Sequence, residues 1–117
     1  MNEEIIDLDE FLERVQDDKE LLCELLDIFM EDFGGKRKAL EEAFGKNDLE
    51  EVRNIAHSLK GASGNISAKP LRQIFLELED AAKNSNLTDT NGCLKQIDEQ
   101  YNLLVSRIES LKKELTA

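Results

Sequence analysis

An unbroken apolar stripe near the C-terminal end of the chain limits the possible folds more than any other feature of the sequence. Seven apolar or aromatic residues follow one another there at alternating spacings of three and four: Leu94, Ile97, Tyr101, Leu104, Ile108, Leu111 and Leu115. Residues at these spacings share one face of an α-helix, and the pattern is typical of the seam of a helical bundle or a coiled coil. The sequence therefore predicts a long final helix that packs along one side against other helices.

The rest of the chain is also patterned as helices. Apolar residues recur at helical spacing in the segments 8–15, 22–44, 49–66 and 71–82, and no stretch of the sequence shows the sustained alternation of a strand. A chain of 117 residues can bury a core of its own, so we expect one domain over residues 1–117. The predicted fold is all-α, an antiparallel up-down four-helix bundle with a short N-terminal helix.

Polar residues and glycines predict where these helices begin and end. Paired glycines often kink or end a helix, so Gly34–Gly35 is expected to break or bend the second one. Residues 83–92 read KNSNLTDTNG and are expected to form a polar loop. Three helix starts are predicted from capping residues, which are Asp17 (with Glu20 three positions on), Asn47 (with Glu50) and Ser67 (ahead of Pro70).

The charge of the chain argues against two classes of partner. The formal net charge is −11 at pH 7, whereas a surface for nucleic acid or anionic membrane needs clustered Lys and Arg. No apolar run approaches the roughly 20 residues of a membrane span, and the acidic N-terminus lacks the basic and apolar regions of a signal peptide. We therefore expect a cytoplasmic protein that binds neither nucleic acid nor membrane.

The cysteines give no sign of a metal site. A structural zinc site needs about four nitrogen or sulfur ligands, and Cys23, Cys93 and the single histidine are the only candidates in the chain. A disulfide is unusual in the cytoplasm, and free cysteine is among the most buried residue types. We expect two free cysteines buried in the core, and no metal.

The single histidine, His57, is placed unusually in the predicted helix that contains it. At about 100° per residue, His57 lies about 130° from the centre of the expected buried face and points to solvent or to the rim of the core. Arg53, Lys60, Gly61 and Gly64 share its side of the helix. A glycine inside a helix costs about 1 kcal/mol relative to alanine, which suggests that the two missing side chains serve another purpose. The expected buried face comprises Leu49, Val52, Ala56, Leu59, Ser63 and Ile66.

This group of residues suits the acceptance and transfer of a phosphoryl group. A neutral imidazole nitrogen is a nucleophile at physiological pH. Lys60, one turn further on, can reach an anionic group on the ring, and the glycines let another molecule's backbone approach it. Positioning and charge stabilisation are most of what a protein supplies to such a transfer. The alternative is an ordinary exposed histidine; a hydrolase is disfavoured because the nearest hydroxyl in the sequence, on Ser58, points to a different face.

The segment HSLKGASGNISA, followed by Leu71, resembles the motif of the histidine-containing phosphotransfer (HPt) domain family, H-x-L-K-G-[small]-[small]-x-x-[apolar]-G-A-x-x-L. The flanking helices ELLDIFMEDF and NDLEEVRNIAHSLKG and the long final helix extend the resemblance over nearly the whole chain. The matching residues are His57, Leu59, Lys60, Gly61, Ala62, Ser63, Ile66, Ala68 and Leu71.

The resemblance implies a phosphocarrier in a multistep His-Asp phosphorelay. His57 would accept a phosphoryl group through Nε2 from the aspartate of a response-regulator receiver domain and pass it to another receiver. A hybrid sensor histidine kinase would be a further partner in the relay. Lys60 would offset the phosphoryl charge, and Arg53, Gly61 and Gly64 would bind or admit the partner. Mg²⁺ would belong to the receiver, so the chain would need no cofactor of its own, have no independent kinase activity and act as a monomer.

Two positions depart from the family pattern. Ser67 stands where the family usually has glycine, and Glu79 stands where several relatives have a glutamine that hydrogen-bonds the histidine. A carboxylate at position 79 could orient the ring, but it would also repel a phosphoryl group. Glu79 therefore leaves open a degenerate HPt domain that binds receivers without transfer. The apolar stripe separately leaves open a helical adaptor that dimerises through residues 94–115.

Overall fold

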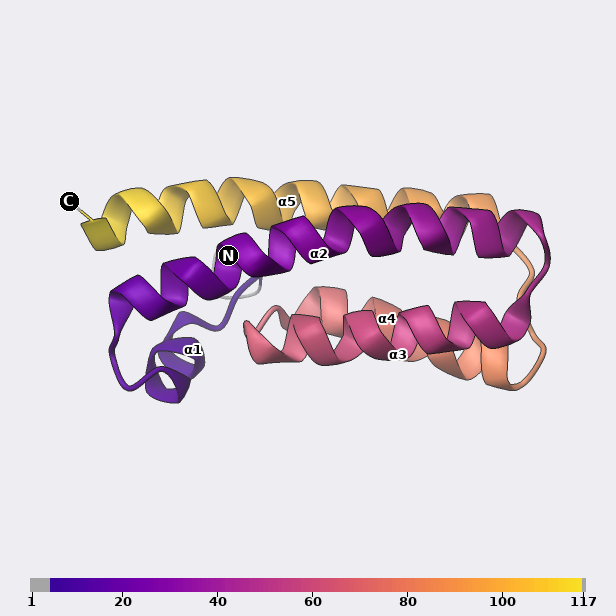
Figure 1. Ribbon diagram of the computed structural model, residues 1–117, viewed down its shortest axis with the longest axis horizontal. Coiled ribbons are helices and arrows are strands. Elements are labelled where there is room, and N and C mark those ends of the chain that lie inside the picture. The colour runs from indigo at the N-terminus through magenta and orange to yellow at the C-terminus, as the bar shows by residue number, and fades with distance from the viewer. Residues whose placement is uncertain (1–4, 117) are drawn as a thin grey trace.

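The computed structural model describes residues 5–116, and within them five helices and no strand (Figure 1). Residues 1–4 and 117, which the predicted domain includes, lie outside the described residues. The helices are α1 (Leu8–Arg14), α2 (Lys19–Gly45), α3 (Leu49–Asn65), α4 (Lys69–Lys83) and α5 (Thr90–Thr116).

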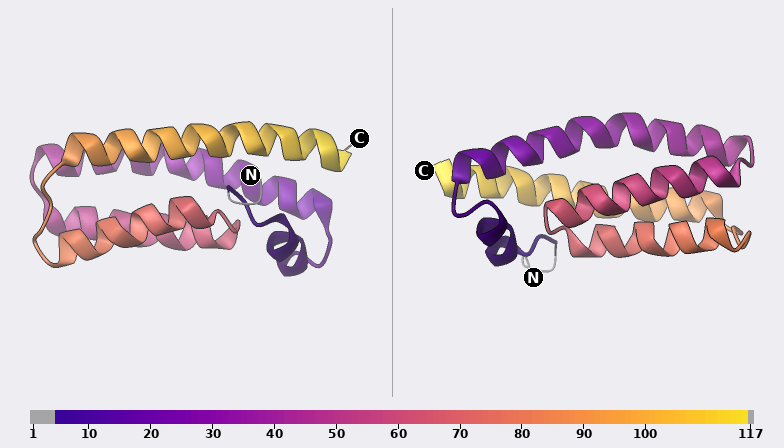
Figure 2. Two further views of the ribbon diagram at one scale, coloured as in Figure 1. Left: turned by 180° about the vertical axis from the view of Figure 1, so that it is seen from behind. Right: turned by 60° about the horizontal axis from the view of Figure 1, so that its bottom comes forward.

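The four longer helices form an up-down bundle. Helices α2 and α5, of 27 residues each, run side by side in opposite directions, and the shorter α3 and α4 form a hairpin alongside them (Figures 1 and 2). Helix α1 lies beyond the turn end of this hairpin, next to the N-terminal half of α2, where the hairpin does not reach (Figure 2). Its Phe11 is fully buried in the common core. The predicted all-α, antiparallel four-helix bundle with a short N-terminal helix is confirmed.

The apolar stripe of α5 is buried against the other helices of the same chain. Four of its seven residues, Ile97, Leu104, Ile108 and Leu111, are at most 1% exposed. The ring of Tyr101 stacks on Phe33 of α2, with centroids 3.8 Å apart and planes 6° from parallel. The face through which an intermolecular coiled coil would form is thus already part of the intramolecular core.

Two helix starts lie one residue later than the sequence predicts. Asp18 and Asp48 cap α2 and α3, and their carboxylates accept hydrogen bonds from Leu21 N (3.0 Å) and Glu51 N (3.1 Å). Asp17 and Asn47, the predicted caps, instead have left-handed backbones with φ of 62° and 55°. Asp and Asn tolerate this conformation better than most residues, so each chain reversal uses the first polar residue for the turn and the second for the cap.

Ser67 does not cap α4, as predicted, but forms the turn before it. The N-cap is Ala68, which provides no side-chain hydrogen bond, while Ser67 has a left-handed φ of 58° and is 1% exposed. Its Oγ donates to Glu10 Oε1 (2.9 Å), and its carbonyl accepts from Asp7 N (2.9 Å). Lys69 adds contacts of 3.0 Å to Asp7 and Glu10, so the turn between α3 and α4 holds α1 in place.

Three smaller expectations have mixed outcomes. Helix α2 continues through Gly34–Gly35, so the predicted break is wrong, because the buried residues on both sides hold the helix together. Cys23 and Cys93 are free as predicted, but both are only partly buried. No helix in the described part of the chain combines the length and the apolar character needed to cross a membrane.

Candidate functional site

Helix α3 places the predicted site residues as its periodicity indicates. The side chain of His57 is 69% exposed, and Arg53 and Gly61 are also exposed. Ser63, on the opposite face, is 0% exposed and belongs to the core. The histidine and its neighbours therefore form an open face on a helix that is otherwise anchored by its buried side.

Helix α4 brings Glu79 against this face. Glu79 Oε2 lies 2.8 Å from His57 Nδ1, and Glu79 Oε1 accepts a 2.6 Å hydrogen bond from Lys60 Nζ. The carboxylate is itself mostly covered, with 15% of the side chain exposed, as is Lys60 with 20%. The residue counted from the motif as the partner of the histidine is thus in contact with it, and one carboxylate joins the histidine to the lysine.

The contact with Glu79 defines which nitrogen of His57 is free. The hydrogen bond from Lys60, followed by the one from His57, holds the pKa of Glu79 below its ordinary value, so this side chain is a carboxylate at neutral pH. An ionised carboxylate only accepts hydrogen bonds. The Nδ1 atom of a neutral ring must therefore carry the hydrogen, and the lone pair of Nε2 faces solvent.

The two glycines of this face have different surroundings. A Cβ atom at Gly61 would meet nothing within 4 Å, so this position is open to an approaching molecule. A Cβ at Gly64 would lie 3.3 Å from Cδ and 3.4 Å from Nε of Arg72, a residue of α4. Gly61 leaves the surface open, as expected, but Gly64 is covered by the Arg72 side chain.

The sequence reasoning missed Arg72, although the register of the hairpin contains the signal. In two antiparallel helices, facing residues have sequence numbers with a constant sum. The pair Gly64 and Arg72 has the same sum as the pair His57 and Glu79. Once Glu79 is matched to the histidine through the family motif, this register predicts that Arg72 faces Gly64.

An apolar groove borders the site on the α2 side. It has a volume of about 210 Å³, and Ile28 of α2 on its rim is 60% exposed, an unusual position for a large aliphatic side chain. Its lining residues are Leu25, Ile28, Phe29, Asp32, Ala62, Asn65 and Ile66. The open face of α3 therefore has polar and charged neighbours on α4 and apolar neighbours on α2.

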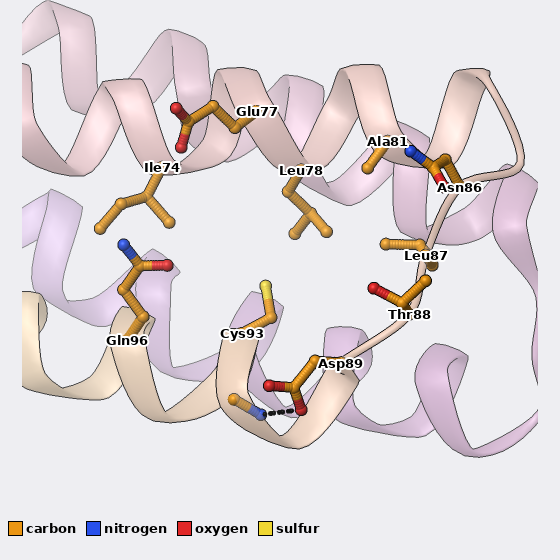
Figure 3. Close-up of a pocket in the computed structure, with 11 residues that line it drawn as sticks. Ile74, Glu77, Leu78, Ala81, Asn86, Leu87, Thr88, Asp89, Cys93 and Gln96 are labelled. Atoms are coloured by element: carbon orange, nitrogen blue, oxygen red, sulfur yellow. Dashed lines mark hydrogen bonds between the residues drawn. The ribbon is translucent and has the colours of Figure 1, made fainter.

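A second hollow, of about 470 Å³, lies between α4 and α5 and shares no lining residue with the His57 site. Figure 3 shows the Cys93 sulfur pointing toward Leu78 across this hollow. Burial, with a smaller contribution from the charge of Asp89, raises the pKa of the Cys93 thiol, which disfavours the reactive thiolate. No group of three or more His, Cys, Asp or Glu side chains in residues 5–116 has the arrangement of a metal site.

The comparisons with known proteins identify the family. Residues 24–112 match the family model of the Hpt domain, which is about three quarters of the chain. Histidine-containing phosphotransfer protein 2 of Arabidopsis thaliana is 27% identical over 106 residues, which cover 86% of this chain and 67% of the relative. Histidine-containing phosphotransfer protein 5 of the same plant is 21% identical over 105 residues, with the same coverage. The chain belongs to the Hpt family, as its motif predicts.

A solved structure supports the same assignment. The crystal structure of histidine-containing phosphotransfer protein B from Pseudomonas aeruginosa superposes with a TM-score of 0.80 at 25% sequence identity. The match covers 90% of this chain and 93% of the other. Family and fold together support a phosphocarrier role in a phosphorelay.

Proposed function

We propose that the chain accepts a phosphoryl group on Nε2 of His57 from the aspartyl phosphate of a receiver domain and then passes it to the aspartate of another receiver. In the first step the Nε2 lone pair attacks phosphorus, the bond between phosphorus and the aspartyl oxygen breaks, and the receiver regains its carboxylate. The second step is the reverse reaction with a different receiver. The observation that carries the proposal is the Glu79 contact, which occupies Nδ1 and leaves Nε2 exposed beside the open surface of Gly61.

Lys60 and Glu79 have complementary tasks in this proposal. Glu79 orients the ring and favours the tautomer with the free Nε2. Lys60, 2.6 Å from Glu79 Oε1, offsets the charge of that carboxylate. Because it lies one helical turn from His57, it would also offset part of the charge of a phosphoryl group on the ring. The pair as a whole is neutral, which answers the concern that a carboxylate here would exclude the phosphoryl group.

The apolar groove supports a docking surface on the α2 side of His57. Exposed aliphatic surface next to a reactive residue is typical of protein interaction sites. We propose that a receiver covers Ile28 and Gly61 together, with Arg53 at the edge of the contact. Mg²⁺ would be held by the receiver, since none of the proposed steps needs a metal bound by this chain.

The cellular setting is also a proposal. A hybrid sensor histidine kinase would be the source of phosphoryl groups, and the protein would act in the cytoplasm as a monomer without kinase activity. Burial of the α5 stripe within the chain supports the monomer, because it occupies the face that a dimeric coiled coil would use. Light scattering at micromolar concentration tests this point, and a stable dimer would contradict it.

Labelling by phosphorylated receivers tests the transfer itself. A panel of receiver domains carrying radioactive phosphate is mixed with the wild-type chain and with His57→Gln, and label on the chain is followed over time. We expect at least one receiver to label the wild type and none to label His57→Gln, while circular dichroism shows equal helicity. Undiminished labelling of His57→Gln would end the proposal. Binding of receivers without any transfer to the wild type would instead favour a degenerate Hpt domain.

A further inference from the structure

The five arginines of the chain fall into two groups. Three of them form ion pairs with the chain's own carboxylates, namely Arg14 with Glu10, Arg37 with Asp98 and Glu41, and Arg107 with Glu114. Arg53 and Arg72 are exposed and form no ion pair with any residue between 5 and 116. Both border the open face that carries His57.

Arg53 and Arg72 lie on either side of the histidine. Arg53 precedes His57 by four residues on α3, and Gly64, over which Arg72 lies, follows it by seven. At 1.5 Å per residue these offsets are about 6 Å and about 10 Å along the helix. A partner that reaches Nε2 of His57 therefore meets a guanidinium group in each direction along α3.

Gly64 indicates that the position of Arg72 matters. Glycine within a helix costs about 1 kcal/mol relative to alanine. The only atoms within 4 Å of a Cβ at this position, outside the helix's own backbone, belong to Arg72. An alanine methyl group at this position would therefore contact this arginine, and glycine avoids that contact. Within residues 5–116 the arginine has no ion-pair partner there.

The chemistry of the proposed partner matches two exposed guanidinium groups. A receiver that carries an aspartyl phosphate and holds Mg²⁺ presents one or two carboxylates beside its phosphorylation site, because Mg²⁺ is usually bound through one or two carboxylates together with phosphate oxygens. A chain with a net charge of −11 repels such a surface as a whole. Arginine binds carboxylates through two parallel hydrogen bonds and is well suited to contact them locally.

We propose that Arg72 is a specificity-determining residue that binds an acidic side chain at the rim of the receiver's phosphorylation site, with Arg53 acting in the same way on the other side of His57. This inference rests on the proposed function and extends it, since neither the family motif nor the sequence periodicity selects Arg72. Arg72 does not touch the reacting atoms. It acts on the binding and orientation of the receiver.

Transfer kinetics with charge-reversed variants test the role of Arg72. The probe is the phosphorylated receiver that labels the wild type fastest, and its concentration is varied to separate KM from kcat. Arg72→Glu is compared with Lys95→Glu, which makes the same charge change at an exposed lysine of α5 without an ion pair in the described structure. Phosphoramidate is a small donor that releases ammonia when it phosphorylates an imidazole, so it reports the reactivity of His57 without a receiver. The kcat of each variant with the receiver is divided by its rate with phosphoramidate.

Arg72→Glu should raise KM for the receiver about 10-fold at low ionic strength, and Arg72→Ala should raise it about 3-fold. Both substitutions should have a smaller effect on kcat. The increase should shrink in 0.5 M salt, as expected for an exposed charge contact. Lys95→Glu should stay within about twofold of the wild type, because α5 lies away from α3. Gly64→Ala should change KM less than Arg72→Ala, because its methyl group requires the Arg72 side chain to move by only a few tenths of an ångström.

The outcomes separate this inference from the proposed function. If the wild type is labelled but Arg72→Glu and Lys95→Glu have the same KM for the receiver, Arg72 does not contact the receiver and the inference is wrong. Phosphotransfer through His57 stands in that case. If no receiver labels the wild type, the proposed function fails and this inference fails with it. Circular dichroism of each variant confirms that the fold is kept, as expected for an exposed residue.

Discussion

Replacement of Glu79 by glutamine tests the central contact of the site. Two donors, His57 Nδ1–H and Lys60 Nζ, share the two carboxylate oxygens at 2.8 and 2.6 Å. Glutamine has one acceptor oxygen and an NH₂ group that only donates, so it cannot serve both donors. If its oxygen faces Lys60, the NH₂ group faces Nδ1, which favours the tautomer with hydrogen on Nε2 and removes the exposed lone pair.

The size of the effect follows from the kind of hydrogen bond that is lost. A bond to a charged group contributes about 1.5–3 kcal/mol and a neutral one about 0.5–1.5 kcal/mol. The difference, about 1–1.5 kcal/mol, corresponds to a transfer rate about 10-fold lower. The substitution also removes the repulsion between the Glu79 carboxylate and a phosphoryl group on Nε2, which opposes the first effect. The two groups would lie on opposite sides of the ring, about 7 Å apart, and two unit charges at that distance interact by about 0.6 kcal/mol in water. Lys60 already offsets most of that repulsion, so the loss of the hydrogen bond should dominate.

Labelling with phosphoramidate is the appropriate assay, because it measures the reactivity of His57 apart from receiver docking. Glu79→Gln should react about 10-fold more slowly than the wild type, and ¹⁵N NMR of the ring should show that the tautomer with hydrogen on Nδ1 no longer dominates. Glu77→Gln is the matched control: it removes the same charge from the same helix, and the Glu77 side chain lines the hollow between α4 and α5 instead (Figure 3). A Glu79→Gln rate equal to or above that of the wild type would show that repulsion outweighs the orientation of the ring.

Substitutions at three further positions test other contacts of the structure. Lys60→Ala leaves the charge of Glu79 without compensation and should slow transfer about 3-fold with unchanged circular dichroism; equal rates would remove Lys60 from the mechanism. Ser67→Gly relieves left-handed strain of about 1–2 kcal/mol while losing the bond to Glu10, whereas Ser67→Ala loses the bond and keeps the strain. Urea unfolding should therefore find Ser67→Ala the less stable of the two, and the reverse order would contradict the strain argument. Arg37 holds the pKa of Asp98 below its ordinary value of 3.8, so this stabilisation is complete above pH 3.8 and is lost as the pH falls through the lower folded-state pKa. Asp98→Asn should narrow the difference in unfolding free energy between pH 7 and about pH 2, and an unchanged difference would refute this account.

The features that the sequence predicts well depend on periodicity within one helix. The α5 stripe, the open side of α3 and the buried Ser63 all follow from residues three or four positions apart, and the structure confirms them. The contact of Glu79 with His57 crosses two helices, and it was accessible only through the resemblance to a family. Helical periodicity alone does not show which residues of two helices face each other.

The wrong predictions have local and long-range causes. Adjacent polar residues at 17–18 and 47–48 both suit a cap, and the choice between them depends on which one adopts the left-handed turn. Gly34–Gly35 lowers helix propensity, but the buried residues before and after it keep α2 continuous, since packing outweighs propensity. The position of Ser67 is determined by Glu10, which lies 57 residues away in the sequence and is brought near only by the folded chain.

The turn at Ser67 connects the structure of the hairpin to its chemistry. The facing pairs His57 with Glu79 and Gly64 with Arg72 share one register between α3 and α4, and that register depends on the length of the turn between the helices. One residue inserted into the turn would shift α4 by about 1.5 Å and rotate it by about 100° relative to its present pairing. Such a change would separate the carboxylate from the imidazole and the arginine from the glycine together. Anchoring the turn to α1 through the bond between Ser67 and Glu10 therefore supports the Glu79–His57 contact and the position of Arg72 over Gly64 at the same time.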